Sequence, residues 1–190
     1  MKIIAILGLS GSGKDTVCKA ISKDLNIPTI VSHTTRPPRS EQEIKELTYH
    51  FVDKEFFEKE KSNFIEQREY IVKLSDGNSE TWLYGIHKDS VCSDINLAIV
   101  DPQGLKSLES YFGKTNVFSF YISCEDKIRM ERLNKRGDTK NIEEVKRREK
   151  DDYIRFKEFI NSTNYYNISN NQELQSAINE IEYILIKYIC

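Results

Sequence analysis

The sequence predicts an α/β fold in which a parallel sheet alternates with helices and a small lobe interrupts the alternation. Short apolar runs of strand length recur along the chain, and the segments between them have apolar residues at helical spacing. Most of the runs are apolar on both faces, which is typical of buried parallel strands. Between residues 33 and 93 the alternation stops and the chain becomes polar. We therefore expect one α/β domain with an insertion at residues 33–93.

The first expected strand, residues 2–7, is followed by a glycine-rich loop and then by a helix over residues 16–25. In that helix Val17, Ile21 and Leu25 recur about once per turn. Further strands are expected at residues 28–32, 97–101, 117–123 and 165–169, and helices at residues 103–112, 125–135, 142–159 and 172–189. Together they predict a five-stranded parallel sheet between two layers of helices, a three-layer core.

The insertion has weaker strand signals. Short strands are expected at residues 49–52 and 69–74. The dipeptide Asp76-Gly77 favours a tight turn, so the second of these strands should form a hairpin with residues 81–84. The insertion is therefore expected to be a small α+β lobe.

The charge balance excludes a general attraction to nucleic acid or to anionic membranes. The 28 Lys and Arg residues face 30 Asp and Glu residues, which leaves a formal net charge of −2. The apolar run near the N-terminus, residues 3–7, is too short for a signal peptide or a membrane span. We therefore expect a soluble, cytoplasmic protein in which any anion site is local.

The cysteines and histidines are isolated from one another in the sequence. There is no C-x-x-C pair and no His at metal-ligand spacing. The cysteines are therefore expected to be free thiols in a reducing compartment, and we assign the histidines no catalytic role. These residues are Cys18, Cys92, Cys124 and Cys190, and His33, His50 and His87.

The stretch GLSGSGKDTV, residues 8–17, predicts a phosphate-binding loop. It matches G-x-x-x-x-G-K-[ST] at Gly8, Gly13 and Lys14, and it lies between an expected strand and an expected helix. Glycines permit the positive φ angles that bring successive N–H groups toward a phosphate, and the helix adds its positive end. The core is thus predicted to be of the P-loop NTPase type. The expected ATP-binding residues are Gly8, Ser10, Gly11, Ser12, Gly13, Lys14, Asp15 and Thr16.

Asp15 departs from this motif, because it stands where a hydroxyl would meet Mg²⁺. A carboxylate beside a polyphosphate is repelled unless a cation lies between them. Asp15 is therefore expected to act on Mg²⁺, directly or through water. Thr16 follows one position later and can reach an α- or β-phosphate oxygen.

Six motifs in fixed order resemble the guanylate kinase family of nucleoside monophosphate kinases. They are GLSGSGKDT (8–16), SHTTRPPR (32–39), YHFVDKEFF with NFIE (49–57 and 63–66), YG (84–85), VDPQG (100–104) and RLNKRGD (132–138). The resemblance covers nearly the whole chain. It implies a core at residues 1–32 and 94–190, a lobe at residues 33–93 that binds the acceptor nucleotide, and a short helical lid at about residues 134–150.

The resemblance also implies a binding site for GMP. Two guanidinium groups with hydroxyl donors suit a dianionic monophosphate. Glu66 matches the residue that reads guanine, since a carboxylate accepts from the N1–H and the amino group of that base and repels the unprotonated ring nitrogen of adenine. Asp101 would organise metal-bound water, Lys14 or the base. The residues implied for GMP are Ser32, Arg36, Arg39, Tyr49, Glu66, Tyr84 and Asp101.

The implied reaction is phosphoryl transfer from ATP to GMP, and also to dGMP, with Mg²⁺ as cofactor. Catalysis would depend on positioning and charge neutralisation, with lid arginines gathered around the phosphoryl group. The residues implied for catalysis are Lys14, Arg132, Arg136 and Arg148, with Arg147 as an alternative to Arg148, and the metal-binding candidates are Asp15 and, through water, Asp101. The expected partners are the two nucleotides alone, in a monomer or homodimer.

Two positions depart from the pattern of this family. Ile86 stands where a Ser or Thr assists in reading the base, and Ile99 stands where an additional acidic residue is usual. These departures leave open a kinase of broader specificity for (deoxy)nucleoside monophosphates. A third possibility is a non-catalytic module that binds phosphorylated peptide, although such a module has no use for Lys14 and a glycine loop.

Overall fold

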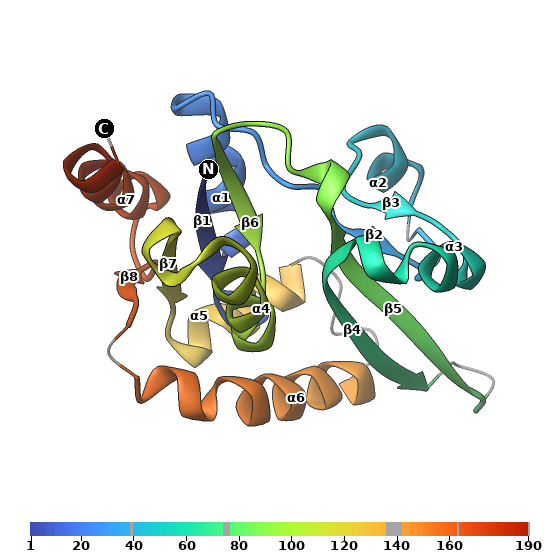
Figure 1. Cartoon of the computed structure of the whole chain (residues 1–190). Helices are drawn as coiled ribbons and strands as arrows, with labels where there is room; N and C mark the ends of the chain where they lie inside the picture. The colour runs from blue at the N-terminus through green and yellow to red at the C-terminus, as the bar shows by residue number, and fades with distance from the viewer. Residues whose placement is uncertain (39, 74–76, 136–141, 163, 190) are drawn as a thin grey trace.

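The computed structural model describes residues 1–38, 40–73, 77–135, 142–162 and 164–189 (Figure 1). Its first sheet is parallel throughout and has the strand order β6-β1-β7-β8. These strands are β1 (Lys2–Leu7), β6 (Ile95–Ile99), β7 (Val117–Ser123) and β8 (Tyr166–Ser169). The predicted α/β fold with a parallel sheet is therefore confirmed.

Helices cover both faces of this sheet. The side chains of β1 are apolar on both faces, and each face is buried against a different set of helices. Ile4 and Ile6 belong to one buried cluster, with side chains of α1 (Lys14–Asp24) and α7 (Leu174–Ile189). Ile3, Ala5 and Leu7 of β1 belong to a second cluster, with side chains of α4 (Pro102–Phe112) and α6 (Ile142–Ile160). Helix α5 (Asp126–Lys135) follows β7.

The prediction of a fifth strand at residues 28–32 was wrong for the sheet as described. This segment makes only an isolated parallel bridge, Thr29 to Leu97, at the edge formed by β6. The Ile30 N–H donates to the Leu97 carbonyl at 2.7 Å, and the Leu97 N–H donates to the Pro28 carbonyl at 2.9 Å. Pro28 has no N–H to extend the ladder. The chain then leaves this edge, since β2 of the second sheet begins at His33.

The insertion builds a second sheet with the order β3-β2-β5-β4. Its strands are β2 (His33–Thr34), β3 (His50–Phe51), β4 (Phe64–Lys73) and β5 (Ser79–His87). The predicted hairpin forms, but β4 and β5 pair antiparallel over a longer stretch than expected. Asp76 of the predicted turn lies outside the described residues. The insertion also contains the short helices α2 (Glu41–Lys45) and α3 (Lys54–Lys59) and the 3₁₀ turns η1 (Lys61–Asn63) and η2 (Lys88–Ser90), and η3 (Lys114–Asn116) follows α4.

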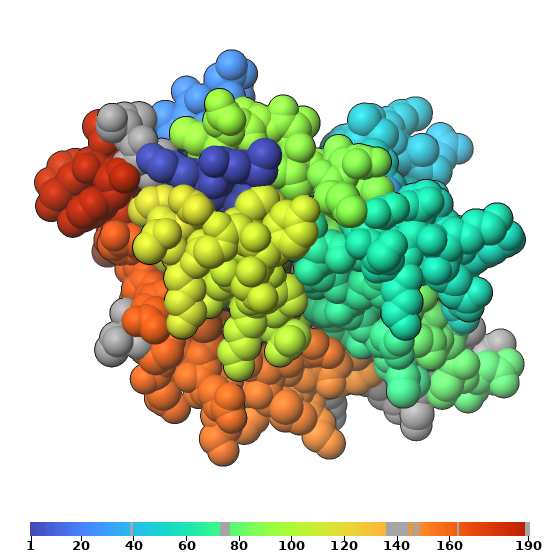
Figure 2. All heavy atoms as spheres, in the orientation of Figure 1, coloured from blue at the N-terminus to red at the C-terminus, as the bar shows by residue number. Residues whose placement is uncertain are grey.

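The two sheets meet along α4, which packs against β4, and α6 runs below both α4 and the hairpin (Figures 1 and 2).

No helix in the described part of the chain is both long and apolar enough to cross a membrane. Cys18, Cys92 and Cys124 are free thiols, as predicted, and Cys190 lies outside the described residues.

Histidines and aromatic rings form a cluster on the second sheet. His33 stacks on Phe56 with ring centroids 5.3 Å apart, and it lies 4.6 Å from His50 and 5.5 Å from His87, also between centroids. Burial, followed by the charges that His50 and His87 would carry, lowers the pKa of His33 from 6.5 to about 4. His33 is therefore neutral in the folded protein at pH values where an unfolded histidine is protonated.

We predict that His33 contributes to acid destabilisation. Its folded pKa lies below its unfolded value, so the stability that it contributes is present above pH 6.5 and is lost as the pH falls toward about 4. His33→Phe keeps a ring to stack on Phe56 and cannot titrate. In urea unfolding the variant should lose less free energy of unfolding between pH 7 and pH 4.5 than the parent chain. An equal loss in both proteins would contradict the prediction.

Candidate active site

The glycine loop after β1 has the backbone conformation that its sequence predicts. Gly11 and Gly13 have φ angles of +82° and +90°, which side-chain-bearing residues rarely adopt. Gly13 is the N-cap of α1, and Lys14 is the first residue of that helix. A Cβ atom at Gly13 would lie 2.4 Å from Nδ2 of Asn170. The loop therefore requires glycine at this position, both for its φ angle and for the neighbouring side chain.

Side chains from distant segments hold the carbonyl groups of the loop. Arg129 donates to the Ser10 carbonyl at 2.6 Å, and the Ser12 carbonyl accepts from Asn170 at 2.7 Å and from Arg132 at 3.1 Å. Arg132 also donates to the Asn170 carbonyl at 3.0 Å. These contacts fix the loop against α5 and the end of β8, so Arg132 supports the loop.

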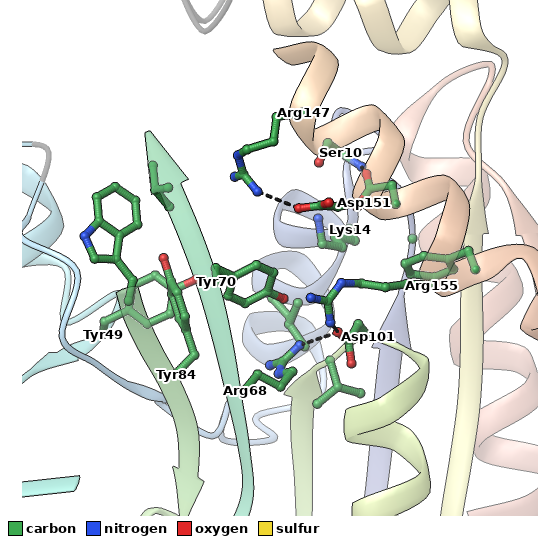
Figure 3. A pocket seen from close by; sticks show the side chains of 17 residues that line it. Ser10, Lys14, Tyr49, Arg68, Tyr70, Tyr84, Asp101, Arg147, Asp151 and Arg155 are labelled. Atoms are coloured by element: carbon green, nitrogen blue, oxygen red, sulfur yellow. Dashed lines mark hydrogen bonds and ion pairs between the residues drawn. The ribbon is translucent and has the colours of Figure 1, made fainter. Parts of the chain in front are cut away.

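A pocket of about 250 Å³ lies where the loop, the second sheet, the end of β6 and α6 meet (Figure 3). Its lining comes from all four elements. The residues are Gly8, Ser10 and Lys14 of the loop and α1; Tyr49, just before β3; Arg68, Tyr70, Val72, Trp82 and Tyr84 of the second sheet; Ile99, Val100 and Asp101; and Arg147, Asp151, Asp152, Arg155 and Phe156 of α6. The pocket therefore joins the phosphate loop to the surface on which the predicted acceptor residues lie.

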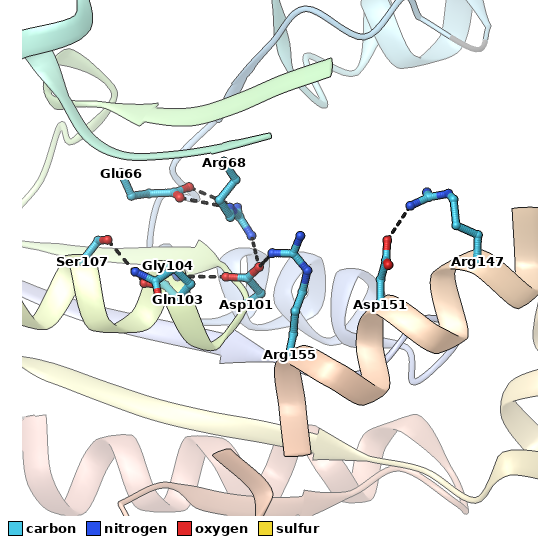
Figure 4. Close-up of polar contacts among 9 residues, drawn as sticks. All are labelled: Glu66, Arg68, Asp101, Gln103, Gly104, Ser107, Arg147, Asp151 and Arg155. Carbon is cyan, nitrogen blue, oxygen red and sulfur yellow. Dashed lines mark hydrogen bonds and ion pairs between the residues drawn. The ribbon is translucent and has the colours of Figure 1, made fainter. Parts of the chain in front are cut away.

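Four charged side chains form a continuous network at one side of this pocket (Figure 4). Arg68 contacts both oxygens of Glu66, with Nη2 donating to Oε1 at 3.1 Å and Nε lying 3.0 Å from Oε2. Its third nitrogen, Nη1, lies 3.2 Å from Oδ2 of Asp101. Arg155 donates to the same Oδ2 at 3.0 Å, and the Gly104 N–H donates to Oδ1 at 2.8 Å. Two cations and two anions thus neutralise one another.

The pKa shifts favour the charged forms of Asp101 and Arg68, whereas burial, opposed by Arg68, raises the pKa of the Glu66 carboxyl above its usual value. Burial works against the charge of Asp101, but Arg68, the Gly104 N–H and Arg155 outweigh it and hold the pKa of this carboxyl below its usual value. Burial likewise works against the charge of Arg68, but Glu66, Tyr70 and Asp101 hold its pKa above the ordinary value. Arg68 therefore stays a cation at any physiological pH.

The structure brings some of the predicted acceptor residues together. Tyr49 and Tyr84 line the pocket with ring centroids 5.8 Å apart, and burial, followed by the effect of Tyr84, raises the pKa of Tyr49 to about 12. Arg36 lies over the Tyr49 ring and is paired with Glu43 at 3.0 Å. The half-buried Ser32 precedes β2, and its carbonyl accepts from the His50 N–H. Arg39 lies outside the described residues.

The arginines predicted to act in catalysis do not all lie at the pocket. Arg132 holds the glycine loop and does not line the pocket. Arg136 and the side chain of Arg148 lie outside the part of the chain that the structure describes. Arg147 lines the pocket and pairs with Asp151 on the next turn of α6. The described side chains therefore favour Arg147, the alternative, as the arginine that reaches the site.

Several residues of the site were not predicted from the sequence. The most consequential are Arg68, Tyr70 and Arg155. Arg68 and Tyr70 follow Glu66 at intervals of two, which is the spacing of one face of a strand, so strand periodicity could have found them. Arg155 lies two helical turns after Arg147 in α6, a weaker signal in a helix rich in charges. Trp82, Asp151 and Asp152 also line the pocket.

The two predicted departures have different surroundings. Ile86 is fully buried and belongs to the apolar cluster under α4 and α6. On the neighbouring strand it lies directly opposite Glu66. Ile99 lines the pocket at the end of β6. Neither side chain can donate or accept a hydrogen bond, so the polar character of this part of the pocket comes from the charged network.

The described residues fit Mg²⁺ unequally. Both oxygens of Asp101 are already engaged by three donors, so this carboxylate has little capacity left for metal-bound water. Asp15 has a side chain that is 62% exposed and lies 3.6 Å from Lys14. No cluster of three or more His, Cys, Asp or Glu side chains suited to a metal occurs among the described residues. Mg²⁺ in phosphoryl-transfer sites is bound largely by phosphates and water, so one carboxylate is compatible with it.

Comparison with known proteins decides the family. The sequence model of the family described as guanylate kinase matches residues 1–188. The chain belongs to the guanylate kinase family. A guanylate kinase from Clostridium acetobutylicum is 33% identical over 99% of this chain and 86% of its own length. A guanylate kinase from Carboxydothermus hydrogenoformans is 31% identical over 96% of this chain and 86% of its own length.

Solved structures agree with the fold of this guanylate kinase family member. The crystal structure of guanylate kinase from Anaplasma phagocytophilum superimposes with a TM-score of 0.66 at 23% identity, over 100% of this chain and 87% of that one. At this identity the likeness concerns the fold alone.

We predict that Gly13→Ala weakens nucleotide binding at the loop, and Gly77→Ala is its matched control. Both glycines have positive φ, +90° and +86°, so both substitutions carry a backbone cost of about 1–2 kcal/mol. Only the Cβ at position 13 collides with a neighbour, since nothing lies within 4 Å of a Cβ at position 77. Isothermal titration with ATP should show at least about tenfold weaker binding for Gly13→Ala alone. Equal binding by the two variants would exclude the loop as the nucleotide site.

Proposed function

We propose that this chain is a guanylate kinase that transfers the γ-phosphoryl group of ATP to GMP and dGMP. The observation that carries the proposal is one pocket that joins Lys14, after the glycine loop, to Tyr49, Tyr84 and Arg68 of the inserted lobe, where Arg68 is paired with Glu66. A loop suited to a polyphosphate and a surface suited to a nucleoside monophosphate thus face one cavity. Membership of the guanylate kinase family supports the same activity.

The proposed division of labour follows the two sheets. Residues 1–32 and 94–190 form the core that binds ATP, and residues 33–93 form the lobe that binds the acceptor. Residues at about 134–150 form the lid, from which Arg147 reaches the pocket. Arg132 contributes by holding the Ser12 carbonyl of the loop. Arg136 and Arg148 remain part of the proposed lid.

The acceptor phosphate would lie near Tyr49 and Tyr84, with Arg36, Arg39 and Ser32 as further donors. A phosphate monoester has a second pKa near 6, so at neutral pH it is mostly dianionic and needs no general base. Lys14 and Arg147 would neutralise the phosphoryl group from the donor side. This explains why no histidine or cysteine is required, and the described cysteines and histidines lie outside the pocket lining.

Asp15 is the residue that we propose to hold Mg²⁺ or its water, and Thr16 would reach an α- or β-phosphate oxygen. When bound there, Mg²⁺ would supply positive charge that offsets the negative charge of the phosphates. Asp15 is the second residue of α1 and lies beside Lys14. Its carboxylate is therefore close to where the polyphosphate would bind.

A broader (deoxy)nucleoside monophosphate kinase is the second candidate, favoured by the buried apolar Ile86 opposite Glu66. A non-catalytic phosphopeptide-binding module is a third possibility. The glycine loop, with positive φ at Gly11 and Gly13 and with Lys14 at the start of α1, disfavours it, because a binding module needs no donor site.

A panel of acceptors tests the activity. We expect turnover in a coupled assay with ATP and Mg²⁺ for GMP and dGMP, and at least about 100-fold lower kcat/KM for AMP, CMP, UMP and dTMP, because a site with buried polar partners rejects a mispaired base strongly. Lys14→Ala is the control for contaminating kinases and should abolish most of the rate. Good turnover of another nucleotide with negligible turnover of GMP would contradict the specificity, and unchanged activity of Lys14→Ala would contradict the mechanism.

We predict that Asp15→Ser retains activity and changes the metal dependence. The substitution removes one negative charge beside the phosphates and supplies the hydroxyl that the loop motif usually carries. A titration of rate against Mg²⁺ concentration should have a shifted midpoint, by about two- to tenfold, at similar maximal rate. Asp15→Asn separates the two effects, since it removes the charge without adding a hydroxyl. An unchanged midpoint in both variants would show that Asp15 does not act on the metal.

A further inference from the structure

We infer that Arg68 is a specificity-determining residue that reads the O6 edge of the guanine base, beside Glu66. The inference rests on the proposed function and deepens it, because it names the residue that discriminates a 6-oxo from a 6-amino purine. Arg68 has no counterpart among the residues expected from the sequence. Arg68 lines the pocket and is paired with Glu66 and Asp101.

Arg68, and not Glu66, is the member of the pair that faces the pocket. The Arg68 side chain is 12% exposed and lines the pocket, whereas the Glu66 side chain is 1% exposed and is absent from the lining (Figures 3 and 4). Both residues are on β4, two positions apart, and therefore on one face of the strand. A base that approaches this surface meets the guanidinium group before it meets the carboxylate.

Arg68 keeps donors for a ligand after its protein contacts are made. A guanidinium group has five N–H donors. Three contacts engage it within the described part of the chain, two to Glu66 and one to Asp101, which leaves two N–H groups for an acceptor. Glu66 likewise keeps lone pairs, because an ionised carboxylate offers about four acceptor sites. The pair therefore presents donors and acceptors side by side.

The guanidinium group is held in place before any ligand binds. Glu66 and Asp101 contact it on two sides. Asp101 is itself fixed by the Gly104 N–H and by Arg155, whose guanidinium lies over the Tyr70 ring at 4.6 Å. A donor held in this way loses little conformational freedom when it binds a base.

The guanine edge is complementary to such a pair. O6 and N7 are acceptors, and a fork of arginine N–H groups to these two atoms is the commonest base-specific contact in protein–DNA complexes. The N1–H and 2-amino groups are donors that suit Glu66. Adenine carries an amino group in place of O6, so it would set a donor against the donors of Arg68. Ile86, opposite Glu66, is apolar and fully buried, so its side chain supplies no donor at this place, whereas Arg68, two residues from Glu66 on the same strand, does.

The test compares Arg68→Met with the parent chain on three acceptors, GMP, IMP and 6-thioguanosine 5′-monophosphate. GMP and IMP share O6 and the N1–H, whereas the sulfur of the thio analogue is a weak acceptor. We expect Arg68→Met to lower kcat/KM for GMP and IMP equally, by about 10- to 100-fold, and for the thio analogue by less than about threefold. The preference for GMP over the thio analogue should therefore disappear in the variant.

Equal losses on all three acceptors would overturn the inference, because they would show that Arg68 only positions Glu66. An unchanged rate with GMP would overturn it as well. Arg155→Met is the matched control, since it removes the other cation on Asp101 and should affect the three acceptors alike. If Arg68→Met does not fold, Arg68→Gln replaces it in the test, because glutamine keeps an N–H donor. Its preference for GMP over the thio analogue must then be weaker than that of the parent chain but not lost. Failure of the proposed function has a different signature, namely no turnover of GMP by the parent chain.

Discussion

The relative placement of the two sheets and α6 depends on the contacts of the Asp101 carboxylate. Asp101 follows β6, caps α4 through the Gly104 N–H, and binds Arg68 of the second sheet and Arg155 of α6. One carboxylate thus joins the core sheet, the inserted sheet and the helix beside the lid. Removing one partner of a buried ion pair typically costs 3–5 kcal/mol, because the remaining charge is left without compensation. The relative position of the two sheets is therefore coupled to the charge balance of the pocket.

This network changes the character of the surface that we propose reads the base. A lone buried Glu66 would present a single anion, whereas Glu66 paired with Arg68 presents a neutral surface with both donors and acceptors. Arg155 completes the compensation of charge from α6. Any movement of α6 or of the second sheet would alter Asp101 and, through it, Arg68.

The glycine loop depends on a different set of long-range contacts. Arg129, Arg132 and Asn170 hold its carbonyl groups from α5 and from the end of β8. Asp152 of α6 accepts the Ser10 N–H at 2.8 Å. The loop motif is local, but the rigidity of the loop is not. Its conformation is supported by residues more than a hundred positions away in the chain.

The sequence by itself determined the alternation of strands and helices, the glycine loop and the family motifs, since apolar periodicity and the φ preference of glycine are local properties. Strands β1 and β7 have the predicted bounds, whereas residues 28–32 form only a bridge, because strand pairing depends on where the chain goes next. Only the tertiary structure decided that Arg132 holds the loop, that Arg147 lines the pocket and that Arg68 covers Glu66. Except for Arg68 and Glu66, which share one face of β4, these arrangements bring together side chains of different elements, and no local pattern specifies which charges meet when those elements pack.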